Sequence, residues 1–141
     1  MYRSALALMF AVLALQPALA QGDAPAGRLN LELNAIQSVQ AGCRVTFLAT
    51  NDLPAAIDRA AVEMAFFVQD GSIERIVTLD FKALSPGKTK VLQFELTDLA
   101  CADIRRLLVN DITACDGVGL VPADCLGALA TSSRPDITFG I

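Results

Sequence analysis

Apolar and polar residues alternate with a period of two over much of the chain after residue 28. Leu29, Leu31 and Leu33 are separated by polar residues, and similar alternation starts again at Cys43 and at Val91. Successive side chains of a β-strand point to opposite faces, so this pattern predicts strands with one buried face. Turn residues separate the runs about every ten residues. We therefore expect an all-β fold, an immunoglobulin-like antiparallel β-sandwich of about seven strands.

Two turns are marked by specific residues. Asp70-Gly71 separates the apolar run 60–69 from a run that alternates through Ile73, Val77 and Leu79. An Asp-Gly pair between two such runs predicts a two-residue type I′ hairpin, because Gly accepts the positive φ that this turn requires. The sequence Ser85-Pro86-Gly87-Lys88 predicts a type II turn, since Pro fixes φ at its second position and Gly accepts a positive φ at its third.

The stretch 97–110 fits two structures. Asp98 could cap a short helix with an apolar face, whereas the β-branched residues further on favour a strand. We expect a helical turn near 98–103 followed by a strand over about 104–114. Residues 126–131 and 137–139 then predict a last, broken strand.

The first twenty residues have the three zones of a secretory signal peptide. A single basic residue, Arg3, precedes an apolar run from Ala5 to Leu15, and Ala18-Leu19-Ala20 gives a small-residue cleavage pattern. The apolar run is too short for a membrane-spanning helix, so we expect no stable membrane anchor. We expect a Sec-type signal over 1–20 that is cleaved after Ala20, a flexible leader over 21–28 and a single domain over 29–141.

The four cysteines predict two disulfides in an oxidising compartment, the periplasm or the exterior. Three pairings are possible among Cys43, Cys101, Cys115 and Cys125. We favour Cys43 with Cys101, which joins distant strands, and Cys115 with Cys125, which closes a short loop. Zinc binding and thiol redox chemistry are the alternatives, and both lack a Cys-x-x-Cys spacing to support them.

Composition excludes several classes of function. The chain has no His and no Trp, so the commonest general base and the commonest sugar-stacking side chain are missing. Without residues 1–20 the chain carries ten basic and fifteen acidic residues, a net charge of −5. This charge argues against nucleic acid as a partner. We expect no enzyme activity, no catalytic residues, no cofactor and no metal site.

Acidic residues are frequent in the last third of the chain, at Asp98, Asp103, Asp111, Asp116 and Asp124. Carboxylates near Asn110 are potential calcium ligands, but their spacing differs from that of a calcium-binding loop. We expect solvated turn carboxylates. The alternative function that this region supports is the binding of a small ligand or metal ion.

Two residues are candidates for contact with a partner. Phe66 and Phe67 are adjacent in a predicted strand, so they point to opposite faces, and an exposed Phe67 beside Val68 would form an apolar contact patch. Arg134 follows two serines and would suit a carboxylate on a partner, or else belong to a polar turn. We expect a non-catalytic interaction module of the cell envelope, whose partner is another envelope protein.

The chain resembles two groups of exported proteins. The residues from Phe66 to Gly71, with Leu84-Ser85-Pro86-Gly87 and Phe94, resemble the middle of FxLYD-type immunoglobulin-like modules. The whole mature chain resembles a small uncharacterised family of exported alphaproteobacterial proteins, often labelled as twin-arginine-pathway proteins. The second resemblance depends on Cys43-Arg44, Asn51, Asp70-Gly71, Pro86-Gly87, Leu99-Ala100-Cys101, Asn110-Asp111, Cys115-Asp116-Gly117, Cys125 and Ser132-Ser133-Arg134. It implies one domain, two disulfides and an envelope location.

Overall fold

The structure is a computed structural model that describes residues 27–141. Its elements follow the chain as β1 (Leu29–Val39), β2 (Gly42–Asn51), β3 (Ile57–Val68), β4 (Ile73–Leu84), β5 (Thr89–Thr97), a 3₁₀ turn η1 (Cys101–Asp103), β6 (Ile104–Asp116), α1 (Pro122–Ala128), β7 (Leu129–Ser133) and β8 (Thr138–Gly140). The expected signal over 1–20 and most of the expected leader over 21–28 lie outside the described residues. Within residues 27–141, no helix is long and apolar enough to cross a membrane.

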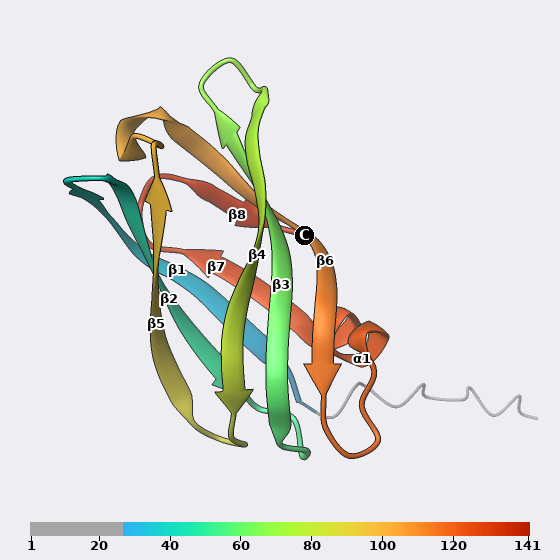
Figure 1. The fold of residues 1–141 in the computed structure, drawn as a ribbon. Helices are drawn as coiled ribbons and strands as arrows, with labels where there is room; N and C mark the ends of the chain where they lie inside the picture. The colour runs from blue at the N-terminus through green and yellow to red at the C-terminus, as the bar shows by residue number, and fades with distance from the viewer. Residues whose placement is uncertain (1–26) are drawn as a thin grey trace, which may run out of the picture.

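The strands form two four-stranded sheets that pack face to face (Figure 1). Sheet A has the order β5-β2-β1-β7, and sheet B has the order β4-β3-β6-β8. The expected all-β sandwich is therefore confirmed, as is the helical turn before the long strand β6. The described residues form eight strands instead of seven, because the expected broken last strand divides into β7 in sheet A and β8 in sheet B. The immunoglobulin-like assignment stays a prediction.

The sheets are mixed, so the expectation of a purely antiparallel sandwich was wrong. Strand β7 runs parallel to β1, and β8 runs parallel to β6. In sheet A, β1 and β5 both run antiparallel to β2, and in sheet B, β4 and β6 both run antiparallel to β3. The chain thus reverses from strand to strand, and a parallel pair arises wherever two odd-numbered or two even-numbered strands become neighbours.

Two local expectations near the β3–β4 hairpin need correction. Gly71 has a φ of +84°, but Asp70 is not in the left-handed region, so the turn is not type I′. The Val68 N–H bonds to the Ser72 carbonyl across a three-residue loop. Pairing with β3 also shifts between Arg75 and Ile73. Ile73 therefore leaves the inward face shared by the half-buried Val77 and the buried Leu79, and it is 53% exposed.

The later turns are partly as expected. The Ser85–Lys88 turn has Gly87 at a φ of +71° and a Lys88 N–H to Ser85 carbonyl bond, as a type II turn requires. Helix α1 was not expected from the sequence, and Leu126, which was expected in a strand, lies in this helix. Pro122 at the start of α1 and Asp124, whose carboxylate accepts the Val121 N–H, are the local signals for this helix.

The core lies between the inner faces of the sheets and contains a group of aromatic rings. The Phe47 ring centroid is 5.6 Å from that of Phe81 and 5.7 Å from that of Phe139, so β2 of sheet A contacts two strands of sheet B. Phe94 completes the group, 5.4 Å from Phe81. Rings of this size supply a large share of the buried apolar area that stabilises a small domain.

Both disulfides have the favoured pairing, Cys43–Cys101 and Cys115–Cys125. The first joins β2 to η1 across 58 residues of sequence, and the second joins the end of β6 to α1 across 10 residues. The chain-entropy model assigns about 4 kcal/mol to a loop of the first length and about 3 kcal/mol to one of the second.

Asn51 is fully buried at the end of β2 and joins the two sheets. Its side-chain amide donates to the carbonyls of Ala55 (3.0 Å) and Leu84 (2.9 Å), and its Oδ1 accepts the Leu53 N–H (3.0 Å). Leu84 belongs to β4 of sheet B, whereas Ala55 and Leu53 belong to the connection between β2 and β3. One amide therefore satisfies three backbone groups where the sheets meet.

Replacing Asn51 with Ala should lower the free energy of unfolding by about 2–4 kcal/mol, because it leaves one buried and two half-buried backbone groups without partners. Urea denaturation followed by circular dichroism would measure this loss. The matched control is Thr50→Ala, which removes only an exposed hydroxyl pair with Thr89. Equal effects of the two substitutions would show that Asn51 does not join the sheets energetically.

Candidate interaction surface

The outer face of sheet A is mainly polar. Its outward residues include Arg44 and Glu95, which form an ion pair, and Gln93, which donates to the Thr46 hydroxyl. Leu48 and Val91 lie opposite each other on β2 and β5 and form a large apolar pair on this face. Such a face is typical of a sheet surface that stays in contact with water.

The outer face of sheet B carries a continuous group of apolar side chains, which we call the outer apolar patch. Its members are Ala65, Phe67, Ile73, Ile76 and Leu108. Ala65 on β3 lies between Ile76 on β4 and Leu108 on β6, and Phe67 lies opposite Ile73. Ile73 and Ile76 are 53% and 50% exposed. Figure 1 shows the three strands β4, β3 and β6 that carry the patch.

Alternation along β3 determines which residues face the outer side of sheet B. Ala65 faces outward but is itself buried, with 2% exposure. Met64 and Phe66 point inward and are fully buried, so Ala65 and Phe67 point outward. The expectation that the two phenylalanines face opposite ways is confirmed. Phe66 belongs to the core, whereas Phe67 is half-buried on the outer face.

Arg106 partly covers the Phe67 ring. Its guanidinium carbon lies 5.1 Å from the ring centroid, across the β3–β6 pair. A guanidinium over an aromatic face gains a cation–π attraction of about 0.5–1 kcal/mol at an exposed site. This contact holds a positive charge at one end of the patch.

The opposite end of the patch carries negative charge. Glu63 lies two residues before Ala65 on β3, and a bulge in β6 places Asn110 and Asp111 beside it. Asn110 donates its side-chain N–H to the Glu63 carboxylate. Within residues 27–141, neither Glu63, Asp111 nor Arg106 takes part in a salt bridge.

Two cationic side chains bond from one sheet to the other on the side of the sandwich where β4 and β5 form the sheet edges. Lys90 on β5 donates to the carbonyls of Phe81 (3.5 Å) and Ala83 (3.1 Å) on β4. In the reverse direction, Arg75 on β4 donates to the Thr97 carbonyl on β5 (2.7 Å). Charged side chains at these edges oppose the addition of a further strand.

Strand β4 has a further irregularity before it ends. Lys82 has a φ of +61° and pairs with Ala60 where the register shifts. The Asp80 carboxylate accepts the Lys82 N–H (2.9 Å) and bonds to the Lys82 ammonium (3.1 Å) and to Arg59 (3.2 Å). These bonds, the Lys82 N–H first, lower the pKa of Asp80 from 3.8 to about 2.

The opposite side of the sandwich has short edges. Strand β7 has five residues and β8 has three, and the turn between them is tied to β1 by the Arg134 N–H to Leu33 carbonyl bond (2.9 Å). Short edge strands are poor templates for strand addition. The outer apolar patch is therefore a more suitable binding surface than any of the four sheet edges.

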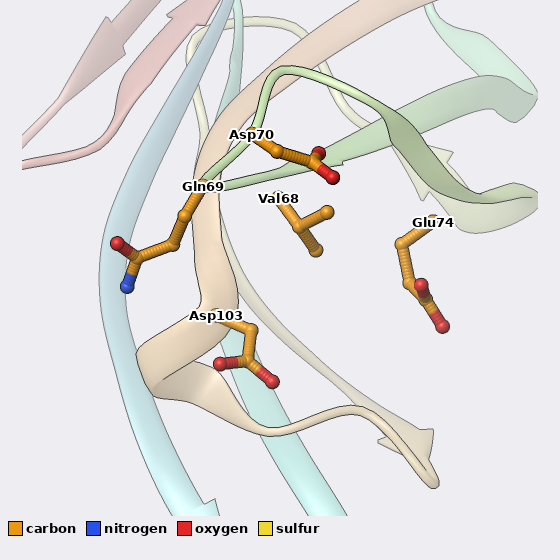
Figure 2. Close-up of a pocket in the computed structure, with 5 residues that line it drawn as sticks. All are labelled: Val68, Gln69, Asp70, Glu74 and Asp103. Carbon is orange, nitrogen blue, oxygen red and sulfur yellow. The ribbon is translucent and has the colours of Figure 1, made fainter.

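A hollow of about 300 Å³ lies between the tip of the β3–β4 hairpin and η1. Figure 2 shows the residues that line it, Val68, Gln69, Asp70, Glu74 and Asp103. Gln69 donates to the Ala102 carbonyl. Asp70 accepts the Ser72 hydroxyl and N–H, and these bonds lower its pKa. The hollow is open and acidic, and Asp70 already has its hydrogen-bond partners.

The structure disperses the acidic residues of the last third of the chain. Asp103 lines the hollow, Asp124 binds the Val121 N–H at α1, and Asp111 accepts the N–H of the next residue. Asp98 lies in a turn with a φ of +58°, and Asp116 ends β6. Among residues 27–141, no three acidic, His or Cys side chains are grouped as metal ligands.

Of the two expected contact residues, only Phe67 belongs to the patch. Arg134 is exposed in the turn between β7 and β8, and no hydrogen bond or ion pair among the described residues links it to the patch. Reasoning from the sequence missed Ile73, Ile76, Leu108 and Arg106. The strands that carry them were expected, but the bulges and strand order that bring these residues to one face have no clear sequence signal.

The lowered pKa of Asp80 predicts a dependence of stability on pH. The ionised carboxylate stabilises the folded state above about pH 4, and this contribution is lost as the pH falls toward about 2. In Asp80→Asn the thermal midpoint should lie below that of the wild type near neutral pH, and the gap should close between about pH 4 and about pH 2. Thermal denaturation at several pH values would measure it, with the exposed Asp58→Asn as control. A gap that stays constant down to pH 2 would contradict this assignment.

Comparison with known protein families, with curated proteins and with solved structures gives no match for this chain. The resemblances stated from the sequence stay predictions.

Proposed function

We propose that the chain is a non-catalytic protein-interaction module of the cell envelope, which binds another envelope protein through the outer apolar patch. The observation that carries this proposal is the difference between the two outer faces. Sheet A is polar outside, whereas sheet B presents Phe67, Ile73, Ile76 and Leu108 together. Exposed apolar side chains gathered on one face and bordered by charges are typical of a protein-binding surface.

The shape of the surface favours a macromolecular partner. The patch extends over three neighbouring strands of a sheet, whereas small-molecule sites are usually concave and enclose most of the ligand. The hollow beside η1 is open and is lined mainly by carboxylates. No observation favours the alternative of a small ligand or metal ion bound by the acidic last third, because its carboxylates lie apart.

The location supports the same function. Two disulfides indicate an oxidising compartment outside the cytoplasm. We propose that a Sec-type signal over 1–20, cleaved after Ala20, directs the chain to the periplasm or the exterior. We also propose that the sandwich is an immunoglobulin-like module; two four-stranded sheets packed face to face support this, and such sandwiches serve as binding domains in many exported proteins.

Crosslinking of the tagged, exported protein in its native envelope, followed by affinity purification and mass spectrometry, tests this function. We expect a partner whose recovery falls at least about tenfold in Phe67→Asp and in Ile76→Asp, because a charge introduced within an apolar contact must be desolvated. Since both side chains lie outside the core, the thermal midpoint should fall by about 5 °C or less.

The matched control is Val91→Asp, which introduces the same charge at an exposed apolar residue on the outer face of sheet A. It should leave recovery of the partner unchanged. Equal recovery with wild type, Phe67→Asp and Ile76→Asp would place binding elsewhere on the molecule. Collapse of the fold in Phe67→Asp would show that this ring acts as a core residue, and Ile76→Asp would then decide the location.

A further inference from the structure

We propose that the outer apolar patch also binds a second copy of this chain, in a symmetric dimer that is the partner-free form of the protein. This inference rests on the proposed function, since it assigns an occupant to the same surface. It depends on the arrangement of charges at the two ends of the patch, and on how a twofold axis would relate two such surfaces.

Three rows of side chains cross the outer face of sheet B at the outer apolar patch and its two ends. The first row contains Ile73, Phe67 and Arg106, the second Ile76, Ala65 and Leu108, and the third Thr78, Glu63 and Asp111. Positive charge therefore lies at one end and negative charge at the other, with apolar side chains between them. Glu63 and Phe67 are four residues apart on β3, which places the end rows about 13 Å from each other.

This separation prevents the charges from pairing within one molecule. Among residues 27–141, Arg106 contacts the Phe67 ring but no carboxylate, and neither Glu63 nor Asp111 has a cationic partner. Their complement must come from outside the chain or from solvent. A partner that fits the patch has acidic groups facing Arg106 and a basic group facing Glu63.

A second copy has this complement. In an isologous dimer, the same surface contributes from both molecules, and each contact occurs twice. If the twofold axis runs along the middle row, the two β3 strands lie antiparallel, and the first row of one copy faces the third row of the other. Arg106 of each copy then approaches Glu63 and Asp111 of its partner, while the middle rows pack against each other.

The protein purified after export would show the dimer directly. Sedimentation velocity and light scattering from about 1 μM to about 1 mM should show a reversible monomer–dimer equilibrium. Arg106→Glu and Glu63→Arg should each raise the dimer Kd by about tenfold or more, because like charges then face each other across the interface. The double variant R106E/E63R restores opposite charges and should return the Kd to within about threefold of wild type.

Two controls separate this effect from general changes of charge or stability. The variant R44E/E95R makes the same exchange on the outer face of sheet A and should leave the Kd unchanged. The neutral variant R106Q/E63Q keeps the side-chain sizes similar, and its Kd should lose most of the salt dependence seen in the wild type. Thermal midpoints of all variants show whether each one is folded.

A monomer at every concentration would overturn the inference, and so would a dimer whose Kd is insensitive to both single charge reversals. If the single reversals weaken the dimer and R106E/E63R does not restore it, the first row of one copy does not face the third row of the other. The proposed function would survive each of these results if an envelope partner is still captured through Phe67 and Ile76. Loss of the partner with an intact dimer would instead overturn the proposed function alone.

Discussion

The packing of the two sheets around Phe47 determines which face of every strand meets water. The Phe47 ring contacts Phe81 and Phe139 of the opposite sheet, so β2, β4 and β8 are held with these residues inward. Because side chains alternate along a strand, fixing one inward residue fixes the whole set on each face. The outer apolar patch is therefore a consequence of the core, since Met64 and Phe66 turn Ala65 and Phe67 outward.

The edges of the sheets are poorly suited to strand addition, so the outer face of sheet B is the surface that remains for the binding we propose. Lys90 and Arg75 bond to backbone carbonyls across the β4–β5 side, and Asp80 accepts the Lys82 N–H where the pairing of β4 with β3 shifts register. A partner strand at either edge would have to displace these bonds. On the outer face of sheet B, no such bonds have to be displaced at Ile73 and Ile76. Their exposed apolar area is unfavourable in water, so covering it would lower the free energy.

Much of the fold was predictable because its strands and turns have local signals. The alternation from Leu29 and from Cys43, the Pro-Gly turn and the pairing of the cysteines all depend on residues close in sequence or on simple loop lengths. The parallel neighbours of β1 and β6 were not predictable, because they depend on which strands meet in space. The same holds for Ile73, which leaves the buried face through a one-residue shift in pairing that its own sequence does not mark.

Within the candidate site, only a residue on a single strand could be predicted from the sequence. Adjacent phenylalanines on one strand imply that one ring faces outward, and Phe67 does so. Its neighbours come from β4 and β6, which follow the sequence rules for strands but give no indication of their register with β3. The acidic residues of the last third show the same dependence on the fold, since residues that are near in sequence here occupy a turn, a position beside a bulge and the start of a helix.

Arg106 affects both the solubility of the outer apolar patch in the free protein and, under the proposed function, the choice of partner. In the free protein its guanidinium lies over Phe67 and reduces the apolar area in contact with water while its charge remains hydrated. A partner without an acidic group at this position would bury the charge unpaired, which costs several kcal/mol. A partner with a carboxylate there gains a charge-assisted bond next to the apolar contact. Under the proposed function, the same residue would therefore admit one class of partner and reject purely apolar surfaces, and the small exposed patch would avoid indiscriminate association.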